Sequence, residues 1–275
     1  MTYKRYGVVF KTLRKQKHLP LSYFESFGIE KTTIQRFETG KTMMGFEKLD
    51  CALQAMNVTL GEYEHFLNFF QPDYLEEVVN EVIGNIYLEN NVRLQMIAQD
   101  CAENDQLILS LATRSCYEKL NEEDIEKIVS YLYDIRQWGY FELSIFYIVM
   151  KQFSEREIMH LMRDFWDKGK DFYGIFKYRR RFLETSYKAI LILSLRGCKD
   201  SVNTIIKESY FTDKVYDIYC ENLRRLSVGV YKQMFFNSRA GYIEWQSACN
   251  LFKDFGHDEL YDYYRKSLRV LDETE

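Results

Sequence analysis

The sequence predicts an all-α protein in which a small helical domain precedes a longer array of paired helices. Only two prolines, Pro20 and Pro72, occur in 275 residues, and proline is the residue that most often interrupts a helix. Hydrophobic residues make up 47% of the chain, enough for a small core followed by a larger one. Several glycines follow an apolar helical pattern and are expected to end helices at the C-terminal side: Gly28, Gly40, Gly139, Gly197 and Gly256.

The net charge of −4 is unevenly distributed along the chain. Residues 1–60 contain ten Lys and Arg against five Asp and Glu, which leaves 27 against 36 for the remainder. A basic N-terminal region on an acidic body is typical of a protein that presents one end to a polyanion such as nucleic acid.

The cysteines are far apart and form no Cys-x-x-Cys pair, a pattern typical of reduced thiols in a cytoplasm. The N-terminus is basic and polar, unlike a secretory segment. The longest apolar run, about residues 189–195, is much shorter than the roughly 18 residues that cross a bilayer. We therefore expect a cytoplasmic protein with no membrane-spanning helix. The six cysteines are Cys51, Cys101, Cys116, Cys198, Cys220 and Cys249.

Residues 1–66 are expected to form five short helices. An apolar stripe at helical spacing predicts the first helix, with Tyr6, Val9, Phe10 and Leu13. A second helix follows Pro20, with Phe24 and Phe27 facing inward, and a third covers about residues 31–39. The fourth presents Phe46, Leu49, Leu53 and Met56 to the core. The fifth begins with a capping box formed by Thr59 and Glu62. Helices in this order predict a compact helix-turn-helix domain.

The third of these helices has one apolar side and one polar side. Ile34, Phe37 and Glu38 share the first, whereas Thr32, Gln35, Arg36 and Thr39 follow the spacing i, i+3, i+4, i+7 on the second. An arginine on such a side can bind guanine O6 and N7 with two hydrogen bonds, which discriminates bases by about 1–3 kcal/mol. The polar side therefore indicates DNA recognition, although a basic helical face can also serve solubility alone.

Leu13-Arg14, residues 31–42 and residues 49–60 resemble the phage-repressor (XRE) type of helix-turn-helix domain. The resemblance implies that Arg14 pairs with Glu38, that Lys31, Thr32 and Arg36 face base edges, and that Thr33, Lys41 and Thr42 approach phosphates. Three departures from the pattern leave the operator sequence open: Glu25, Leu21 or Ser22 at the start of the second helix, and Thr39. The candidate DNA-binding residues are Lys31, Thr32, Thr33, Gln35, Arg36, Lys41 and Thr42.

A linker at 67–72 is expected to join the DNA-binding domain, residues 1–66, to a repeat domain at 73–275 that regulates and dimerises. Helix pairs that recur at roughly 33 to 40 residues indicate a tetratricopeptide-like solenoid, without a clean consensus. Asn121 and Ser154 mark two helix starts. The expected helices cover residues 73–90, 91–104, 105–120, 122–138, 140–153, 155–172, 175–196, 200–210, 214–236, 239–255 and 258–272.

The first helix of each pair is expected to line the concave side of this array, at 105–120, 140–153, 175–196 and 214–236. Long polar side chains among aromatic ones suit an extended peptide, whose backbone needs hydrogen-bond partners and whose apolar side chains need pockets. The same tyrosines and phenylalanines can simply pack helix against helix. The candidate peptide-binding residues are Arg114, Tyr147, Lys151, Gln152, Arg179, Arg180, Tyr187, Cys220, Asn222 and Arg225.

The arrangement of a repressor-type domain before helical repeats, together with the segment from Trp138 to Leu143 (WGYFEL), resembles the Rgg family of Gram-positive regulators. This family belongs to the wider group of peptide-pheromone receptors. The resemblance implies a cytoplasmic homodimer that binds double-stranded promoter DNA and takes up a short apolar signalling peptide, as in quorum sensing. We expect helices at about 239–272 to join the two copies.

Two other classes of function remain open. The repeats could hold a protein partner, which would make the chain a DNA-binding scaffold. An enzyme is not expected. Glu157 and His160 have the Glu-x-x-His spacing of a di-iron ligand pair, but such sites need a second copy and two more glutamates. The sequence contains no glycine-rich phosphate loop, so we expect no catalytic residues, metal or cofactor.

Overall fold

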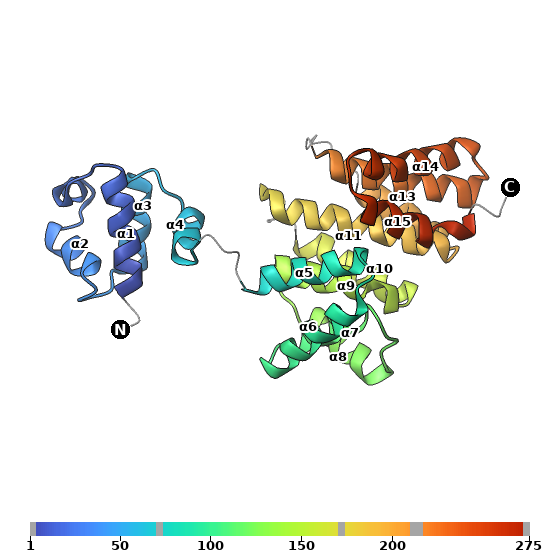
Figure 1. Ribbon diagram of the computed structural model, residues 1–275, viewed down its shortest axis with the longest axis horizontal. Coiled ribbons are helices and arrows are strands. Elements are labelled where there is room, and N and C mark those ends of the chain that lie inside the picture. The colour runs from blue at the N-terminus through green and yellow to red at the C-terminus, as the bar shows by residue number, and fades with distance from the viewer. Residues whose placement is uncertain (1–3, 70–73, 170–173, 210–216, 272–275) are drawn as a thin grey trace. The chain divides into compact units, whose positions relative to one another are not determined.

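The computed structural model describes residues 4–69, 74–169, 174–209 and 217–271, and within these residues the chain forms helices and no strands. The all-α prediction is confirmed. The chain divides into two compact units, Met1–Glu77 and Val78–Glu275, each described separately below (Figure 1). The boundary falls in the first turn of α5 (Tyr74–Tyr87), slightly after the expected linker, whose residues 70–72 lie outside the described part.

The N-terminal unit consists of α1 (Lys4–Gln16), η1 (Leu21–Phe27), α2 (Lys31–Glu38), α3 (Phe46–Ala55) and α4 (Leu60–Leu67). Its core contains Phe10, Leu13, Phe24, Ile34, Phe37, Leu49, Leu53 and Met56. The expected capping box of Thr59 and Glu62 is present at the start of α4.

Two aromatic residues expected in that core lie at the surface instead. Phe27 is 44% exposed and Phe46 is 69% exposed. Both stand at the end of a helix. Phe27 is the last residue of η1, where its ring contacts Tyr23, and Phe46 is the first residue of α3. The spacing of apolar residues identifies the face that turns inward, but it does not show where along the helix the core ends.

A glycine brings the backbones of α1 and α2 together. A Cβ atom at Gly7 would lie 1.8 Å from the carbonyl oxygen of Phe37 and 2.6 Å from its carbonyl carbon. No side chain fits in that space, so the close approach of α1 to the end of α2 requires glycine here. This contact fixes the position of α2 within the N-terminal unit.

The repeat unit arranges its helices in two rows. α7, α9, α11 and α13 pack successively against one another, and α8, α10 and α12 form the row behind them. This architecture is the tetratricopeptide-like solenoid predicted from the sequence. After α5, the helices are α6 (Asn91–Glu103), α7 (Leu107–Arg114), α8 (Glu122–Tyr133), α9 (Tyr140–Val149), η2 (Met150–Gln152), α10 (Glu155–Lys168), α11 (Phe176–Leu195), α12 (Lys199–Glu208), α13 (Ile218–Phe236), α14 (Arg239–Asp254), α15 (Asp258–Ser267) and η4 (Arg269–Leu271).

Most of the expected helix ends are present, with three corrections. α8 ends at Tyr133 and not at the predicted residue 138. Asn121 and Ser154 cap α8 and α10 as expected. Gly139 does not end a helix: it precedes α9, has φ of −92°, and donates its backbone N–H to Glu142 Oε2 at 3.0 Å. α7 ends at Arg114, earlier than predicted, and the Nε2 of Gln152 donates to the carbonyls of Ser115 and Glu118. Those carbonyls therefore need no continuing helix.

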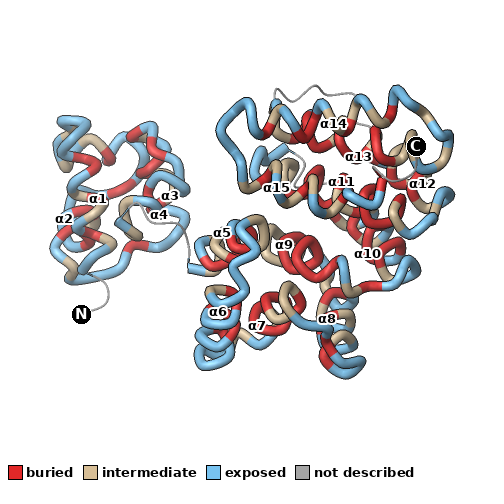
Figure 2. Tube along the Cα trace, turned by 45° about the vertical axis from the view of Figure 1, so that its right-hand side comes forward, coloured by how far each residue is buried: buried red, intermediate tan, exposed pale blue. Residues whose placement is uncertain are grey.

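α9 and α11 form the centre of the repeat unit, and both are buried along most of their length (Figure 2). α9 is apolar on nearly all sides, as expected of a helix inside a core, whereas α11 also buries the charged residues Arg181 and Glu184. Among the described residues, no helix combines the length and apolar character needed to cross a membrane. All six cysteines are free thiols.

Candidate functional sites

The two sides of α2 differ sharply in exposure. The buried side consists of Ile34, Phe37 and Glu38. The exposed side consists of Lys31, Thr32, Gln35 and Arg36, and the following Lys41 and Thr42 are also exposed. Thr33 is partly buried, and the hydroxyl of Thr32 donates to Glu30 Oε2 at 3.1 Å. All seven candidate DNA-binding residues thus belong to one short segment, and six of them are accessible to a ligand.

A buried ion pair anchors the opposite side of α2. Arg14 Nε donates to Glu38 Oε1 at 2.6 Å, and Arg14 Nη2 donates to Glu38 Oε2 at 2.8 Å. Arg14 Nη1 also donates to the carbonyl of Leu19 at 2.6 Å. The two side chains are 9% and 4% exposed, and the hydrogen bond to Glu38 raises the pKa of Arg14. This is the pair that the resemblance implied, and it joins α1 to the end of α2.

Thr39, one of the departures from the repressor pattern, caps the C-terminal end of α2. Its hydroxyl donates to the carbonyl of Gln35 at 2.8 Å and to that of Arg36 at 3.2 Å. Both carbonyls also accept a backbone N–H, Gln35 from Thr39 and Arg36 from Lys41, so the hydroxyl adds a further hydrogen bond to each. Its role in this structure is to end the helix. Glu25, another departure, is exposed on η1.

The repeat unit contains a cavity of about 260 Å³ on its inner row of helices. One part of the wall is apolar and comes from α11 and α13: Leu191, Ile192, Leu195 and Leu223. The rest is aromatic or polar and comes from α9, η2, α11 and α15: Tyr147, Lys151, Glu184, Tyr187, Lys188, Tyr263, Tyr264 and Ser267. α15 therefore contributes to the cavity wall, although the sequence predicted that only the first helix of each pair would line the groove.

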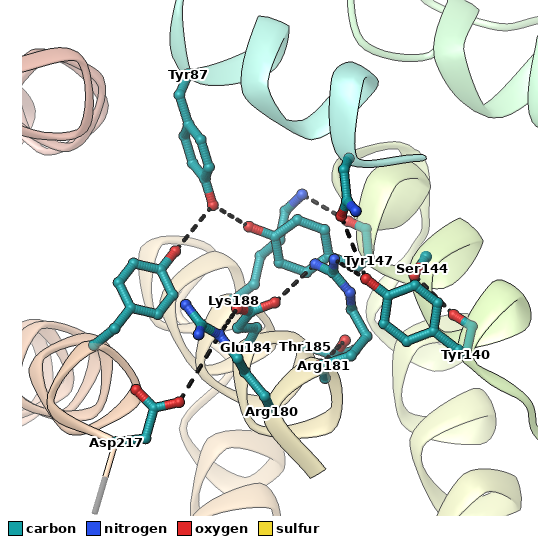
Figure 3. Close-up of polar contacts among 12 residues, drawn as sticks. Tyr87, Tyr140, Ser144, Tyr147, Arg180, Arg181, Glu184, Thr185, Lys188 and Asp217 are labelled. Carbon is teal, nitrogen blue, oxygen red and sulfur yellow. Dashed lines mark hydrogen bonds and ion pairs between the residues drawn. The ribbon is translucent and has the colours of Figure 1, made fainter. Parts of the chain in front are cut away.

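Hydroxyl and charged groups form a connected network behind this cavity (Figure 3). The hydroxyls of Tyr87 and Tyr147 are 2.6 Å apart. Arg181 donates to Glu184 Oε2 at 2.7 Å and to the Tyr140 hydroxyl at 2.9 Å, and its guanidinium lies over the Tyr147 ring. Burial raises the pKa of both Tyr87 and Tyr147, so these hydroxyls stay neutral at ordinary pH. The network holds Tyr147 in place by hydrogen bonds and ring contacts.

Lys188, like Lys151, has no described carboxylate partner, whereas Arg180 and Arg181 of the same helix pair with Glu184. Its Nζ donates to the carbonyl of Tyr147 at 2.6 Å and lies 4.1 Å from the centre of the Tyr147 ring (Figure 3). In the described part of the chain, no Asp or Glu oxygen lies within ion-pair distance of it. Burial, together with the positive charge of Lys151, lowers the pKa of Lys188 to about 7. The neighbouring carboxylate of Glu184 is bound to Arg181 and Arg180 instead.

Three of the ten candidate peptide-binding residues line this cavity: Tyr147, Lys151 and Tyr187. Four others make contacts within the protein. Arg114 pairs with Glu118 and Asp124, and Gln152 binds the backbone after α7. Arg180 pairs with Glu184 and lies over the Tyr219 ring. Asn222 donates to the carbonyl of Ala248 at 2.8 Å.

The last three candidates are Cys220, which is buried, and Arg179 and Arg225, which are partly buried. The sequence interpretation missed the cavity-lining residues Glu184, Lys188, Tyr263 and Tyr264. One signal pointed to Lys188, because it is the only charged residue between Ser186 and Leu195, a largely apolar segment. No comparable local signal marked the two tyrosines of α15, which reach the cavity through long-range packing.

The Glu157 and His160 pair serves local structure. Glu157 completes the capping box with Ser154, and the His160 ring lies 4.6 Å from that of Tyr133. Within the described ranges, no group of three or more His, Cys, Asp or Glu is placed to hold a metal ion.

A family model described as the HTH-type transcriptional regulator Rgg, C-terminal domain, matches residues 85–266. This chain belongs to the Rgg family. The regulatory class expected from the sequence is therefore confirmed, and the family is one of transcriptional regulators rather than enzymes.

Solved structures of pheromone receptors share the fold of this Rgg-family chain. The SHP pheromone receptor Rgg2 of Streptococcus dysgalactiae is 20% identical, with a TM-score of 0.80 over 96% of this chain and 99% of that one. A PrgX/cCF10 complex is 12% identical, with a TM-score of 0.70 over 98% and 92%. A bacterial peptide pheromone/receptor complex is 13% identical, with a TM-score of 0.69 over 98% and 99%. At these identities the likeness shows a common fold.

Proposed function

We propose that this Rgg-family protein is a cytoplasmic homodimer that binds promoter DNA through α2 and binds a short apolar signalling peptide in the cavity of its repeat unit. The peptide changes promoter activity by binding the DNA-competent and DNA-incompetent arrangements with different affinity. The observation that carries the proposal is the cavity on the inner helix row, which combines apolar, aromatic and unmatched basic groups.

The exposed side of α2 supports the DNA-binding part of the proposal. Lys31, Thr32, Gln35 and Arg36 are accessible together, and they are hydrogen-bonding residues of the kind that read base edges. Thr33, Lys41 and Thr42 are proposed to contact phosphates. The Arg14–Glu38 pair serves as a strut that sets the angle of the helix.

The composition of the cavity supports the peptide-binding part. Tyr147, Tyr187 and Lys151 offer aromatic faces and a cation beside the apolar wall of α11 and α13. Peptide pockets commonly combine apolar surface with a few placed polar groups. One of the structures with the same fold is a bacterial peptide pheromone/receptor complex, which is consistent with this use of the repeats.

Dimerisation is proposed to use the final helices, about residues 239–272. Ile243 on α14, Phe255 after it and Val270 near the end of the described chain are large apolar side chains that are more than half exposed. A partner copy could cover them. The alternative function, a DNA-binding scaffold whose repeats hold another protein, would use the same inner row.

The test is a pair of binding measurements on the full-length protein. Selection from a random duplex DNA library should enrich a defined sequence. Synthetic apolar octapeptides encoded by small reading frames beside the gene should raise the melting temperature and change the amount of selected DNA that is bound. If no such peptide shifts either quantity while a protein co-purifies from the cell, the scaffold function replaces the receptor function.

A further inference from the structure

The cavity of the repeat unit has an unbalanced charge. Two lysines line it, Lys188 and Lys151, and neither forms an ion pair with a described carboxylate. The single carboxylate of the wall, Glu184, already accepts hydrogen bonds from Arg181 at 2.7 Å and Arg180 at 3.2 Å. No carboxylate of the wall is therefore left to pair with the two basic side chains that face the cavity.

The two lysines occupy different depths. Lys188 is partly buried on α11, and its Nζ uses one of three donors on the carbonyl of Tyr147. Lys151 is exposed on η2, and its Nζ lies 5.0 Å from the centre of the Tyr263 ring. Both Nζ atoms lie over aromatic rings of the cavity wall, contacts that use none of the N–H donors. A pre-positioned cation with free donors is suited to binding an anion.

The volume of the cavity limits how much of a ligand it can enclose. About 260 Å³ lies just below the roughly 300–1,000 Å³ of pockets that enclose a drug-sized molecule. It therefore accommodates a few residues at one end of a peptide and not a longer extended chain. Leu191, Ile192, Leu195 and Leu223 supply apolar wall for the side chains of that end.

We propose that Lys188, assisted by Lys151, binds a carboxylate of the peptide, and that this carboxylate is the C-terminal one, seated with the last apolar side chains in the cavity. This inference rests on the proposed peptide-binding function and adds the chemistry of its anchor. An aspartate or glutamate side chain of the peptide offers the same group, so the experiment separates the two sources.

The experiment uses four pools of synthetic octapeptides built from Leu, Ile, Val, Phe, Ser and Gly. The first pool has a free C-terminal carboxylate, and the second has a C-terminal amide. The third and fourth are amides that carry one Asp or one Asn at the same position. Each pool is incubated with full-length protein, and the peptides retained on ultrafiltration are quantified by mass spectrometry. The protein variants are Lys188→Met, Lys188→Arg, Lys151→Met and, as a matched control, Lys253→Met on the exposed side of α14.

A terminal anchor predicts that wild-type protein retains the free-acid pool at least about tenfold more than the amide pool, the scale of one charge-assisted hydrogen bond. Lys188→Met should abolish this preference, Lys151→Met should reduce it, and Lys188→Arg and Lys253→Met should keep it. A preference for the Asp pool over the Asn pool, with no preference for the free acid, would assign the lysines to an acidic side chain and overturn the terminal assignment.

Two further outcomes separate the anchor from the proposed function. Equal retention of all four pools would support peptide binding but contradict the proposed carboxylate anchor. Retention of no pool above the filtrate background would remove peptide binding and the anchor together. Melting curves of Lys188→Met, followed by tryptophan fluorescence, show whether the variant is folded. If it is not, the loss of preference expected for Lys151→Met, at an exposed position, keeps the test decisive.

Discussion

Arg14 in the N-terminal unit and Lys188 in the repeat unit are both basic residues of helices that lie against a core, but their surroundings differ. Arg14 has a carboxylate partner with two matched hydrogen bonds and a backbone carbonyl for a third. Lys188 has one backbone carbonyl and an aromatic ring. A cation whose donors are all satisfied inside the protein maintains the structure, whereas one with free donors beside a cavity is available to a ligand.

The largest effect is expected when the ion pair between Arg14 and Glu38 is broken. Arg14→Met should destabilise the N-terminal unit by about 3–5 kcal/mol, because it leaves Glu38 buried without a partner. Hydrogen exchange of the α1 and α2 amides, measured in the full-length protein, should accelerate about a hundredfold or more, or the unit should unfold. The double variant Arg14→Met/Glu38→Leu should recover most of the loss, since it removes both charges. If the double variant is as unstable as the single one, the loss comes from packing and not from the charge.

A second prediction concerns basic residues that are exposed and unmatched. Arg36→Ala should lower discrimination between bases by about 1–3 kcal/mol, measured as the spread of affinities across sequences selected by the wild type. Lys41→Ala should weaken binding to all DNA sequences about equally. It should also reduce the slope of the logarithm of the DNA-binding constant against the logarithm of the salt concentration by about 1. Equal effects of the two changes on base preference would contradict the proposed division between base reading and phosphate contact.

The smallest effect is expected at Lys188 in the absence of ligand. Its folded pKa of about 7 lies below its usual value of 10.5. The unfolded chain therefore binds more protons between these pH values, and the free energy of unfolding of the wild type rises with pH across this window. Lys188→Met lacks that rise. The variant should be more stable than wild type by about 1 kcal/mol near pH 6.5, a value discounted for partial exposure, and the difference should shrink towards pH 9.

Tryptophan fluorescence measures this effect selectively, because Trp138, Trp166 and Trp245 all belong to the repeat unit. Lys253→Met is again the control, and its stability difference from wild type should not vary over the same pH range. A difference for Lys188→Met that stays constant with pH would mean that the lysine is charged in the folded protein at pH 9. The side chain would then be better solvated than its contacts indicate.

Local patterns in the sequence predicted the parts of this molecule that local forces determine. The amphipathic spacing of α2 separated Ile34 and Phe37 from Gln35 and Arg36, and the capping boxes at Thr59 and Ser154 are present. These features depend on residues three or four positions apart, which is the range that helical periodicity covers.

The cavity was only partly predictable because distant helices build it. Periodicity on α11 cannot show that Tyr263 and Tyr264 of α15 complete the wall, since this depends on how α14 turns the chain back. The polar residues expected in the groove, such as Gln152 and Arg114, instead satisfy backbone carbonyls and carboxylates exposed by the early end of α7. These hydrogen bonds depend on where α7 ends, which helical periodicity does not determine to within a few residues.

Contacts between the two ends of the repeat unit have a consequence for how it unfolds. The ring of Tyr87, on α5, packs against those of Tyr263 and Tyr264 on α15, and Glu89 forms an ion pair with Lys266, 177 positions later in the chain. In an open solenoid, each repeat contacts only its neighbours, so the ends can fray independently. Here the first and last helices hold each other, so fraying at one end removes contacts at the other. Loss of the contacts at either end should therefore destabilise the other end as well. The repeat unit should then unfold in one cooperative step and not by fraying of its end repeats.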